Sequence, residues 1–254
     1  MKIAVLVKQV PGSESALPLN NQQDWIDESS VTFVMNPPDN FALEEALLIR
    51  ERMDEGEVVV VSMGPSRVQK VIREGLAKGA DRGIHLEEGD HIEKDPLSIA
   101  TRFSSVLKEE NFDLILSGLQ SDDTGMGQTG VLIGEMLGMS TATLAIETKL
   151  EDGKIRVKRE LESGWFQWVA LPLPASISIQ SGLNTPRYPS LKGIMGAKKK
   201  EIKCVPIELD SDQAQTIEKV FVPQASKQTE VIEEEVDVAV NRIVEILKSE
   251  IKVF

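Results

Sequence analysis

Aliphatic runs alternate with helically spaced apolar positions through the first 140 residues. Four aliphatic segments predict strands, at residues 2–7, 57–63, 82–87 and 113–117. The first two are almost continuously aliphatic, which is typical of parallel strands covered on both faces. Between the strands, apolar residues recur three and four positions apart. This spacing predicts helices that begin near Asp39, near Ser66, at Asp95-Pro96 and near Gln128.

The period changes after residue 140. Residues 141–180 alternate as strands do, and Pro174–Ile179 is expected to return to the parallel sheet as its fifth strand. Residues 181–200 are rich in turn formers and basic residues. Residues 205–228 show no period, which suggests an arm lying over another surface, and apolar positions in 236–251 predict an amphipathic helix.

This order of elements predicts an α/β fold, a doubly wound and mostly parallel sheet with a Rossmann-like layout. We expect two parts, an α/β domain over residues 1–200 and an extended arm with a helix over 201–254.

Composition narrows the class of protein. The 28 Lys and Arg against 41 Asp and Glu give a net charge of −13, which disfavours nucleic acid and anionic membranes as partners. No apolar run approaches the roughly 20 residues of a membrane span. The single cysteine, Cys204, excludes an internal disulfide framework and fits a reducing compartment. The first strand follows Met1 directly, so no signal peptide is expected.

Ligands of such sheets bind beyond the carboxyl ends of the strands. The loops 8–38, 62–66 and 118–129 should therefore gather at one edge. The loop 118–129 contains three glycines, three hydroxyl side chains and the start of a helix, where N–H groups favour an anion. It is neither a Walker A loop nor a dinucleotide fingerprint. It could hold a nucleotide phosphate, or it could be a plain flexible loop.

Other polar or aromatic positions allow two interpretations each. Asn36 and Asp39 could cap a helix or hold a ribose or phosphate. The run Lys198–Lys200 could be a solvated face or could dock an acidic partner. Trp165 and Trp168 suit a core or an interface better than ligand stacking. No set of acid, base or nucleophile stands out, so holding a nucleotide and binding a partner are favoured over bond-making.

The chain resembles the beta subunits of electron transfer flavoproteins. The resemblance rests on several motifs together: residues 3–10, Asn36-Pro37 followed by 42–46, 61–65, 76–85, Gly118-Leu-Gln-Ser-Asp, Gln128-Thr-Gly130, 157–174, 184–191 and 197–200. It implies an electron carrier rather than an enzyme. The expected partner is an alpha subunit that carries most of the redox-active FAD, while this chain binds a structural AMP.

The resemblance also implies three groups of site residues. The AMP positions are Leu6, Asn36, Pro37, Pro38, Asp39, Met63, Gly118, Leu119, Gln120, Ser121, Asp122, Asp123, Thr124, Gly125, Met126, Gly127, Gln128 and Thr129. The partner-docking positions, for acyl-CoA or similar dehydrogenases, are Arg187, Tyr188, Leu191, Ile194 and Met195. Glu160 corresponds to a position near the flavin edge. Electrons would pass on to a membrane quinone oxidoreductase, and the expected location is the cytoplasm or the mitochondrial matrix, the cytoplasm being favoured.

Two departures from the family pattern leave alternatives open. The stretch 162–168 has an extra residue and unusual aromatics, and the loop 118–129 lacks an Ala-Ile-Asp run. Members that bind a second FAD and bifurcate electrons usually carry that run, so AMP is favoured. A stand-alone adenine-nucleotide-binding module is the remaining alternative.

Overall fold

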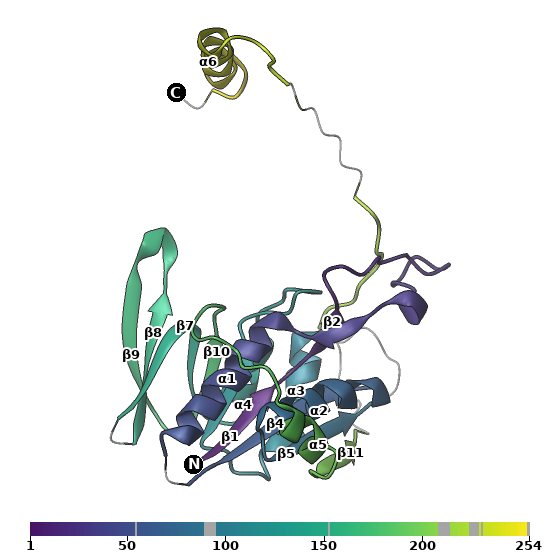
Figure 1. Cartoon of the computed structure of the whole chain (residues 1–254), viewed down its shortest axis with the longest axis vertical. Coiled ribbons are helices and arrows are strands. Elements are labelled where there is room, and N and C mark those ends of the chain that lie inside the picture. Colours follow the sequence, from purple (N-terminus) through teal and green to yellow (C-terminus); the bar gives the residue numbers. More distant parts are fainter. Residues whose placement is uncertain are drawn as a thin grey trace. The chain divides into compact units, whose positions relative to one another are not determined.

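The computed structural model describes residues 1–53, 55–88, 95–151, 153–207, 214–223, 229 and 231–252. They fall into two units, Met1–Val220 and Phe221–Phe254. The first unit is an α/β domain and the second contains a helix (Figure 1).

A nine-stranded sheet organises the first unit. In spatial order its strands are β11 (Ile202–Pro206), β5 (Arg82–Glu87), β4 (Glu57–Gly64), β1 (Lys2–Leu6), β6 (Leu114–Gly118), β10 (Ala175–Ile179), β7 (Ser140–Glu151), β8 (Lys154–Glu160) and β9 (Phe166–Pro172). The strands from β11 to β7 run parallel, and β8 and β9 extend the sheet as antiparallel strands. A separate two-stranded sheet pairs β2 (Gln9–Pro11) with β3 (Phe33–Met35). The predicted doubly wound, mostly parallel sheet is confirmed, with β10 as its expected returning strand.

The order of the parallel strands creates a switch point beside β1. The chain moves from β1 outward to β4 and β5, and then returns to place β6 on the other side of β1. The connections after β1 and β6 therefore leave toward opposite faces of the sheet. A crevice at such a point is where open α/β sheets bind their ligands.

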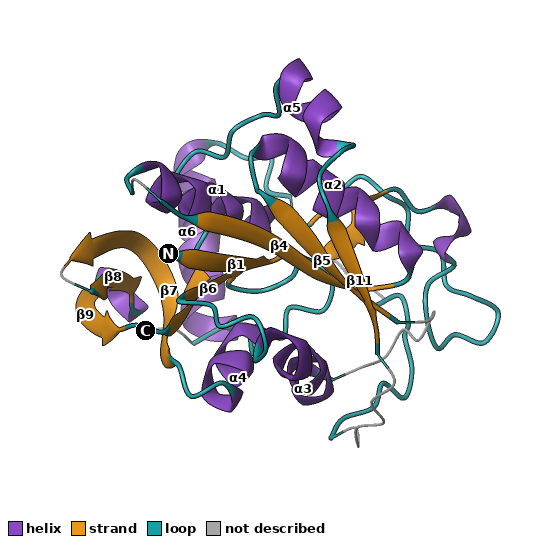
Figure 2. Cartoon of the chain, turned by 90° about the horizontal axis from the view of Figure 1, so that it is seen from below, coloured by secondary structure: helices purple, strands orange, loops and turns teal. Residues whose placement is uncertain are grey.

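Helices cover both faces of the sheet (Figure 2). One face carries α1 (Pro37–Glu51) and α2 (Gln69–Lys78), with α5 (Leu191–Ala197) beside α2, and the other carries α3 (Pro96–Leu107) and α4 (Thr129–Met136). Short 3-10 turns occupy Glu28–Ser30, Ser66–Val68 and Glu162–Gly164. Each face buries its own apolar layer, because odd and even residues of β1 point to opposite sides: Ile3 and Val5 pack under α1 and α2, and Ala4 and Leu6 under α3 and α4.

Most predicted helices are found where the periodicity places them. Asp95 is the N-cap of α3, as expected, since its Oδ1 accepts the Ser98 N–H at 2.7 Å, and the helix ends at Leu107. Helix α5 was not predicted, because its two glycines resemble turn residues. Ser190 caps it by accepting the Gly193 N–H at 3.0 Å.

The boundary between the units differs from the expected one at 200/201. Residues 202–206 form β11, which pairs with β5 in the sheet, so the first unit continues to Val220. Backbone pairing with a distant strand decides this boundary, and the local composition carries no sign of it.

The second unit contains the expected amphipathic helix. It comprises α6 (Val236–Glu245) and a π-helical turn over Ile246–Glu250. Apolar side chains, among them Ile243 and Leu247, line a shallow hollow along it. Over the described ranges, no helix is both long and apolar enough to cross a membrane.

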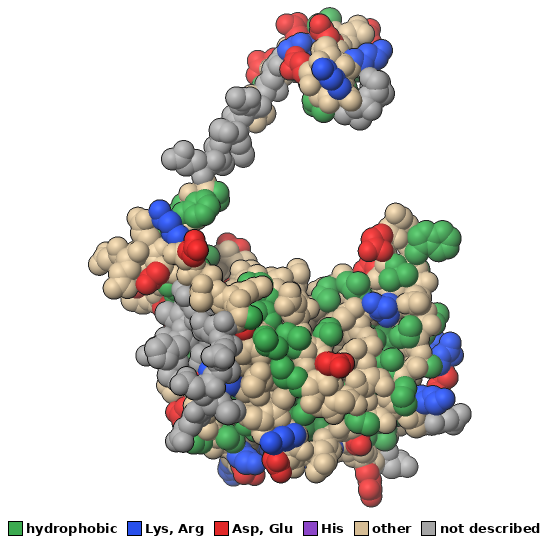
Figure 3. All heavy atoms as spheres, turned by 180° about the vertical axis from the view of Figure 1, so that it is seen from behind, with side chains coloured by type: hydrophobic (Ala, Val, Ile, Leu, Met, Phe, Trp, Pro, Cys, Tyr) green, Lys and Arg blue, Asp and Glu red, His purple; other side chains and the backbone are tan. Residues whose placement is uncertain are grey.

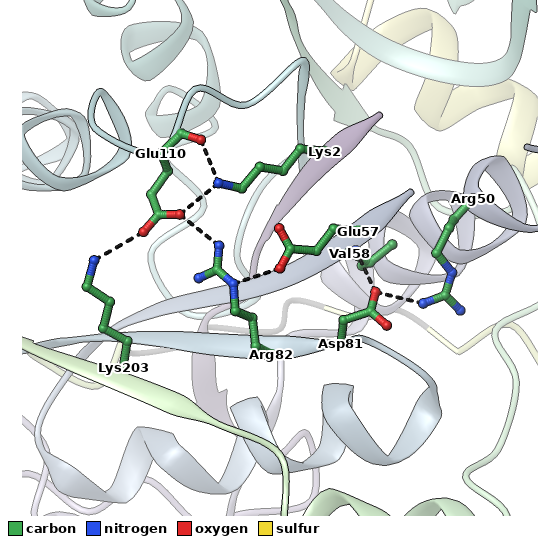
Figure 4. Close-up of polar contacts among 8 residues, drawn as sticks. All are labelled: Lys2, Arg50, Glu57, Val58, Asp81, Arg82, Glu110 and Lys203. Carbon is green, nitrogen blue, oxygen red and sulfur yellow. Dashed lines mark hydrogen bonds and ion pairs between the residues drawn. The ribbon is translucent and has the colours of Figure 1, made fainter. Parts of the chain in front are cut away.

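Charged side chains tie the amino ends of the strands together (Figure 4). Glu110, just before β6, accepts hydrogen bonds from Arg82 Nη2 at 2.7 Å, Lys2 Nζ at 2.9 Å and Lys203 Nζ at 3.2 Å. These three cations come from β5, β1 and β11. Burial alone would raise the pKa of Glu110, but the three donors outweigh it and lower the pKa to about 2. One carboxylate thus joins three strands to the segment before a fourth.

Replacing Glu110 with Gln should destabilise the domain by about 1–3 kcal/mol at neutral pH, because three charge-assisted bonds lose their anion. The pKa of Glu110 is lower in the folded chain than its ordinary 4.5. Its contribution is therefore complete above about pH 4.5 and is lost as the pH falls toward 2. Urea denaturation across this range should show the wild-type and Glu110→Gln curves converging in acid. Glu109→Gln, at an exposed neighbour, is the matched control and should follow the wild type.

Candidate functional site

A buried carboxylate joins the two strands at the switch point. Asp39 Oδ2 accepts the backbone N–H of Lys8, just after β1, at 2.7 Å, and Asp39 Oδ1 accepts the backbone N–H of Gly118, at the end of β6, at 3.0 Å. The Asp39 side chain comes from the first turn of α1. One residue therefore fixes the relative position of both strand ends and a helix start.

The expectation that Asp39 caps a helix is wrong. The N-cap of α1 is Asn36, and Asp39 lies inside the helix with only 5% of its surface exposed. Burial raises the pKa of Asp39 to about 7, although the N–H groups of Lys8 and Gly118 act in the opposite direction. The two strand ends are thus held by a carboxyl group whose ionised form costs free energy to bury.

Asn36 holds the loop 118–129 rather than its own helix. Its Nδ2 donates to Gln120 O at 3.0 Å, and its Oδ1 accepts the Asp122 N–H at 3.0 Å. It makes no side-chain cap bond to α1. The amide is almost fully buried, so the start of the loop is fixed against α1.

The loop 118–129 requires glycine at three positions, for close packing at one and for a left-handed backbone at the other two. A Cβ on Gly118 would collide with the Asp39 carboxylate and would lie 2.7 Å from Pro38 Cβ. Gly125 and Gly127 have φ angles of 62° and 64°, the left-handed conformation expected from the sequence. The loop leads into α4, whose N-cap Gln128 makes no side-chain cap bond. The first N–H groups of α4 are therefore open to an anion.

Lys8 belongs to this site and was not among the predicted residues. Its Nζ lies 2.7 Å from Asp123 Oδ1, 3.3 Å from Ser121 Oγ and 3.4 Å from Thr124 Oγ1. A lysine directly after a buried strand, at the edge where ligands bind, was a signal that could have identified it.

The strand ends also carry two hydroxyls that the sequence analysis missed. Ser117 pairs in register with Leu6 on one side and with Ser178 on the other. Within the described part of the chain, the Oγ atoms of Ser117 and Ser178 are buried without a hydrogen-bond partner. Ser117 Oγ lies where Gly130, in the first turn of α4, leaves room for it. The unpaired hydroxyl of Ser117 thus lies close to the open start of α4.

The predicted nucleotide residues therefore lie at one edge of the sheet. Leu6 and Met63 contribute to the apolar layer beneath α3 and α4, and the segments 36–39 and 118–129 are hydrogen-bonded to each other. Their binding of a nucleotide stays a prediction. Over the described residues, no group of three or more His, Cys, Asp and Glu side chains could hold a metal ion.

The predicted docking residues form a separate group at α5. Tyr188 is 95% and Leu191 83% exposed, and Ile194 and Met195 are also exposed. We call these four residues the docking patch. Arg187 differs, because its side chain turns inward. Its Nε is 2.9 Å from Glu44 Oε2 and its Nη1 is 2.6 Å from Glu51 Oε1, which anchors the segment to α1.

Helix α5 is also held firmly against α2. Arg73 Nη1 donates to Ala197 O and to Lys200 O, each at 2.6 Å. A Cβ on Gly193 would collide with Ala77 O, so the two helices approach closely. Lys200 Nζ donates to Leu76 O at 3.1 Å, so this lysine is bound to the end of α2 rather than being freely solvated. The docking patch is consequently presented on a rigid support.

Glu160 and the unusual aromatics lie on the β8–β9 hairpin. Gln180 Nε2 donates to Glu160 Oε2 at 3.3 Å. Trp165 is 73% exposed, and Phe166 and Trp168 are also exposed, so a core role for the two tryptophans is wrong. Hydrophobic side chains project at the free end of this hairpin (Figure 3). A role at an interface stays a prediction.

Known proteins resemble the chain along most of its length. A family model described as "Electron transfer flavoprotein domain" matches residues 24–209. The chain is 35% identical over 241 residues to "Electron transfer flavoprotein subunit beta" of Methylophilus methylotrophus, which covers 90% of this chain and 91% of the relative. Proteins with the same description match from Dictyostelium discoideum, with 33% identity over 249 residues and coverage of 98% and 97%, and from Homo sapiens, with 33% identity over 234 residues and coverage of 90% and 91%.

Replacing Gly118 with Ala should destabilise the domain by about 1–3 kcal/mol, because a methyl group cannot enter the space beside Asp39 without moving the strand ends. Chemical denaturation measures the loss. Gly196→Ala is the matched control, since its added Cβ would meet no atom within 4 Å. Equal stability of the two variants would contradict the packing described for Gly118.

Proposed function

The chain belongs to the electron transfer flavoprotein family, as a relative of its beta subunits, and from this premise we propose that it is the AMP-holding, partner-docking subunit of a two-subunit electron carrier. The observation that carries the proposal is the meeting of four separate segments at the switch point. Residues after β1, at the start of α1, at the end of β4 and after β6 share this one edge.

The residues at this edge fit an adenine nucleotide. The open N–H groups of α4, the unpaired Ser117 hydroxyl and the ammonium of Lys8 are donors of the kind that a phosphate accepts. Met63, which is only partly buried, offers apolar surface for a base, and the buried Leu6 belongs to the same apolar layer. We infer that Leu6, residues 36–39, Met63 and residues 118–129 hold AMP.

The chemistry of electron transfer would be supplied by FAD, held mainly by a companion alpha subunit. AMP supplies no redox chemistry, so its role is to join the loops of the site. A ligand that binds only the folded chain stabilises that state. This division makes the chain a carrier subunit without catalytic residues of its own. AMP is favoured over a second FAD because the loop 118–129 lacks the Ala-Ile-Asp run of bifurcating members.

Two further surfaces suit the companion subunit. Glu160 would lie near the flavin edge, where Gln180 orients its carboxylate. The second unit exposes Val236, Val238 and Ile243, and we propose that this helix packs on the alpha subunit.

The docking patch would receive the electron donor. Its exposed residues lie on α5 and on the segment just before it, which Arg187 binds to α1 and Arg73 binds to α2. A small, rigid apolar patch suits brief encounters, because little order is lost on contact and little area is buried. The proposed donors are acyl-CoA or similar dehydrogenases, and the proposed acceptor is a quinone-linked oxidoreductase. The cytoplasm or mitochondrial matrix stays the predicted location.

The nucleotide content of the complex tests this function. Co-expression with an alpha subunit should give a yellow complex with one chain of each kind, and mass spectrometry of the released nucleotides should find one FAD and one AMP. Two FAD and no AMP would favour the bifurcating alternative. A colourless monomer that binds AMP by itself would favour the stand-alone module.

Replacing Leu191 with Ala should weaken docking by about tenfold, the cost typical of losing a central apolar anchor. The measured quantity is the KM for reduced dehydrogenase, with the FAD content of the complex expected to stay unchanged. Leu17→Ala removes an exposed leucine outside the patch and serves as the control. The same KM for both variants would exclude Leu191 as the anchor.

A further inference from the structure

The arm that follows β11 lies against the first unit at residues 214–220. These seven residues form no helix or strand. Their side chains are exposed except for Ile217 and Val220, which are half-buried. With so little apolar surface turned inward, the attachment of this segment depends largely on the hydrogen bonds that its backbone makes.

A carboxylate binds the backbone at the start of this segment. Asp95 Oδ2 accepts the N–H of Gln215 at 2.9 Å and also the N–H of Ala214. Two successive N–H groups that converge on one oxygen form a small concavity that suits an anion. Asp95 itself is only 5% exposed, so these bonds are shielded from water. We call Asp95 together with these two backbone bonds the arm clasp.

The end of the segment is held more weakly. The Val220 N–H donates to Gln23 O at 3.1 Å, and Gln23 belongs to the loop between β2 and β3. The arm passes beside this loop in Figure 1. A single hydrogen bond between neutral groups contributes less than bonds to a carboxylate. The arm clasp is therefore the stronger of the two attachments.

The Asp95 carboxylate divides its two oxygens between the arm and a helix. While Oδ2 binds the arm, Oδ1 accepts the Ser98 N–H at 2.7 Å and caps α3. Burial would raise the pKa of Asp95, but the backbone N–H groups of Ser98, Gln215 and Ala214 outweigh it and lower the pKa. Asn and Ser cap helices about as well as Asp does. Neither of them has a second acceptor oxygen for the arm.

From this division of one carboxylate we propose that Asp95 fastens the arm to the first unit and thereby sets how far the second unit can reach toward its partner. The proposal rests on the function inferred above, in which helix α6 packs on the alpha subunit. The attachment is made through the backbone of the arm, so it tolerates other side chains at positions 214 and 215.

The clasp changes the length of chain in front of α6. With the clasp closed, residues 221–235 separate the last bound residue from the helix. With the clasp open, the nearest bound residue is Ile207, whose N–H donates to Glu87 O at 3.1 Å, and residues 208–235 separate it from α6. A connection almost twice as long lowers the effective concentration of the helix at its partner by about two- to threefold.

Limited trypsin digestion of the full chain tests the clasp. Asp95→Ser and Asp95→Asn should both be cut after the exposed Lys219 about tenfold faster than the wild type, as expected for losing a hydrogen bond to a charged acceptor. Mass spectrometry of the fragments identifies the bond that is cut. Cleavage after Lys248, in the second unit, is the internal reference and should not change. Glu109→Gln removes one exposed charge and should be cut as the wild type is.

Asp95→Ala separates the clasp from the helix cap. This variant loses both functions of the carboxylate, whereas Asp95→Ser keeps the cap. The two should be cut equally fast after Lys219, and Asp95→Ala should unfold at a lower urea concentration. A variant that is merely unstable would instead be cut faster throughout the first unit.

Titration with the alpha subunit tests the effect on reach. Asp95→Ser should bind the alpha subunit about two- to threefold more weakly than Glu109→Gln does. Wild-type cleavage rates after Lys219 in both Asp95→Ser and Asp95→Asn would overturn the clasp. Faster cleavage with unchanged affinity would overturn its effect on reach. If the wild-type chain binds no alpha subunit, the proposed function fails together with the effect on reach, and the cleavage rates still decide the clasp.

Discussion

The carboxyl edge of the sheet depends on two hydrogen bonds, which the Asp39 carboxylate accepts from the backbone N–H groups of Lys8 and Gly118. At a switch point the two neighbouring strands send their chains to opposite faces, and the ladder between β1 and β6 ends at the Leu6–Ser117 pair. A carboxylate with two oxygens can accept from both ends at once. The arrangement requires a helix start within reach, which α1 provides, and a residue without Cβ at position 118. The rest of the site is built on these fixed points, since Asn36 and Lys8 then position the loop 118–129.

The carboxylates of Glu110 and Asp39, which lie at the two edges of the sheet, have different environments. At the amino edge every partner of Glu110 is a cation from another strand, and the resulting bonds lower its pKa. At the carboxyl edge Asp39 is buried with a raised pKa, and the hydroxyls of Ser117 and Ser178 have no partner in the described part of the chain. Buried polar groups without hydrogen-bond partners cost free energy of folding. They are therefore commonly kept where a ligand can supply the missing hydrogen bond. The amino edge therefore stabilises the fold, and the carboxyl edge is the one that we propose to bind the nucleotide.

Local pattern predicted much of this architecture, and contacts between distant residues account for what it could not predict. The aliphatic runs of β1 and β4 and the Asp95-Pro96 helix start are properties of short segments, and they were found as expected. Helix α5 was missed because Gly193 resembles a turn residue. Its actual role is to allow close packing on α2, which lies more than a hundred residues earlier in the chain. The strand at Cys204 depends on pairing with β5. The sequence identified Asp39 as a candidate residue but could not show that its partners lie in two other elements. Lys8 was missed for the same reason, because its role depends on a loop reached only after residue 118.

Helix α1 is shared by both proposed working surfaces of the chain. Asn36 and Asp39 at its start hold the nucleotide edge, and Glu44 and Glu51 further along grip the segment that bears the docking patch. A helix advances about 100° and 1.5 Å with each residue. Inserting or deleting one residue between Asp39 and Glu44 would therefore rotate one set of contacts out of reach of its partners. The number of residues between these acidic positions is consequently fixed by the fold, because both sets of contacts must be made from one helix at the same time.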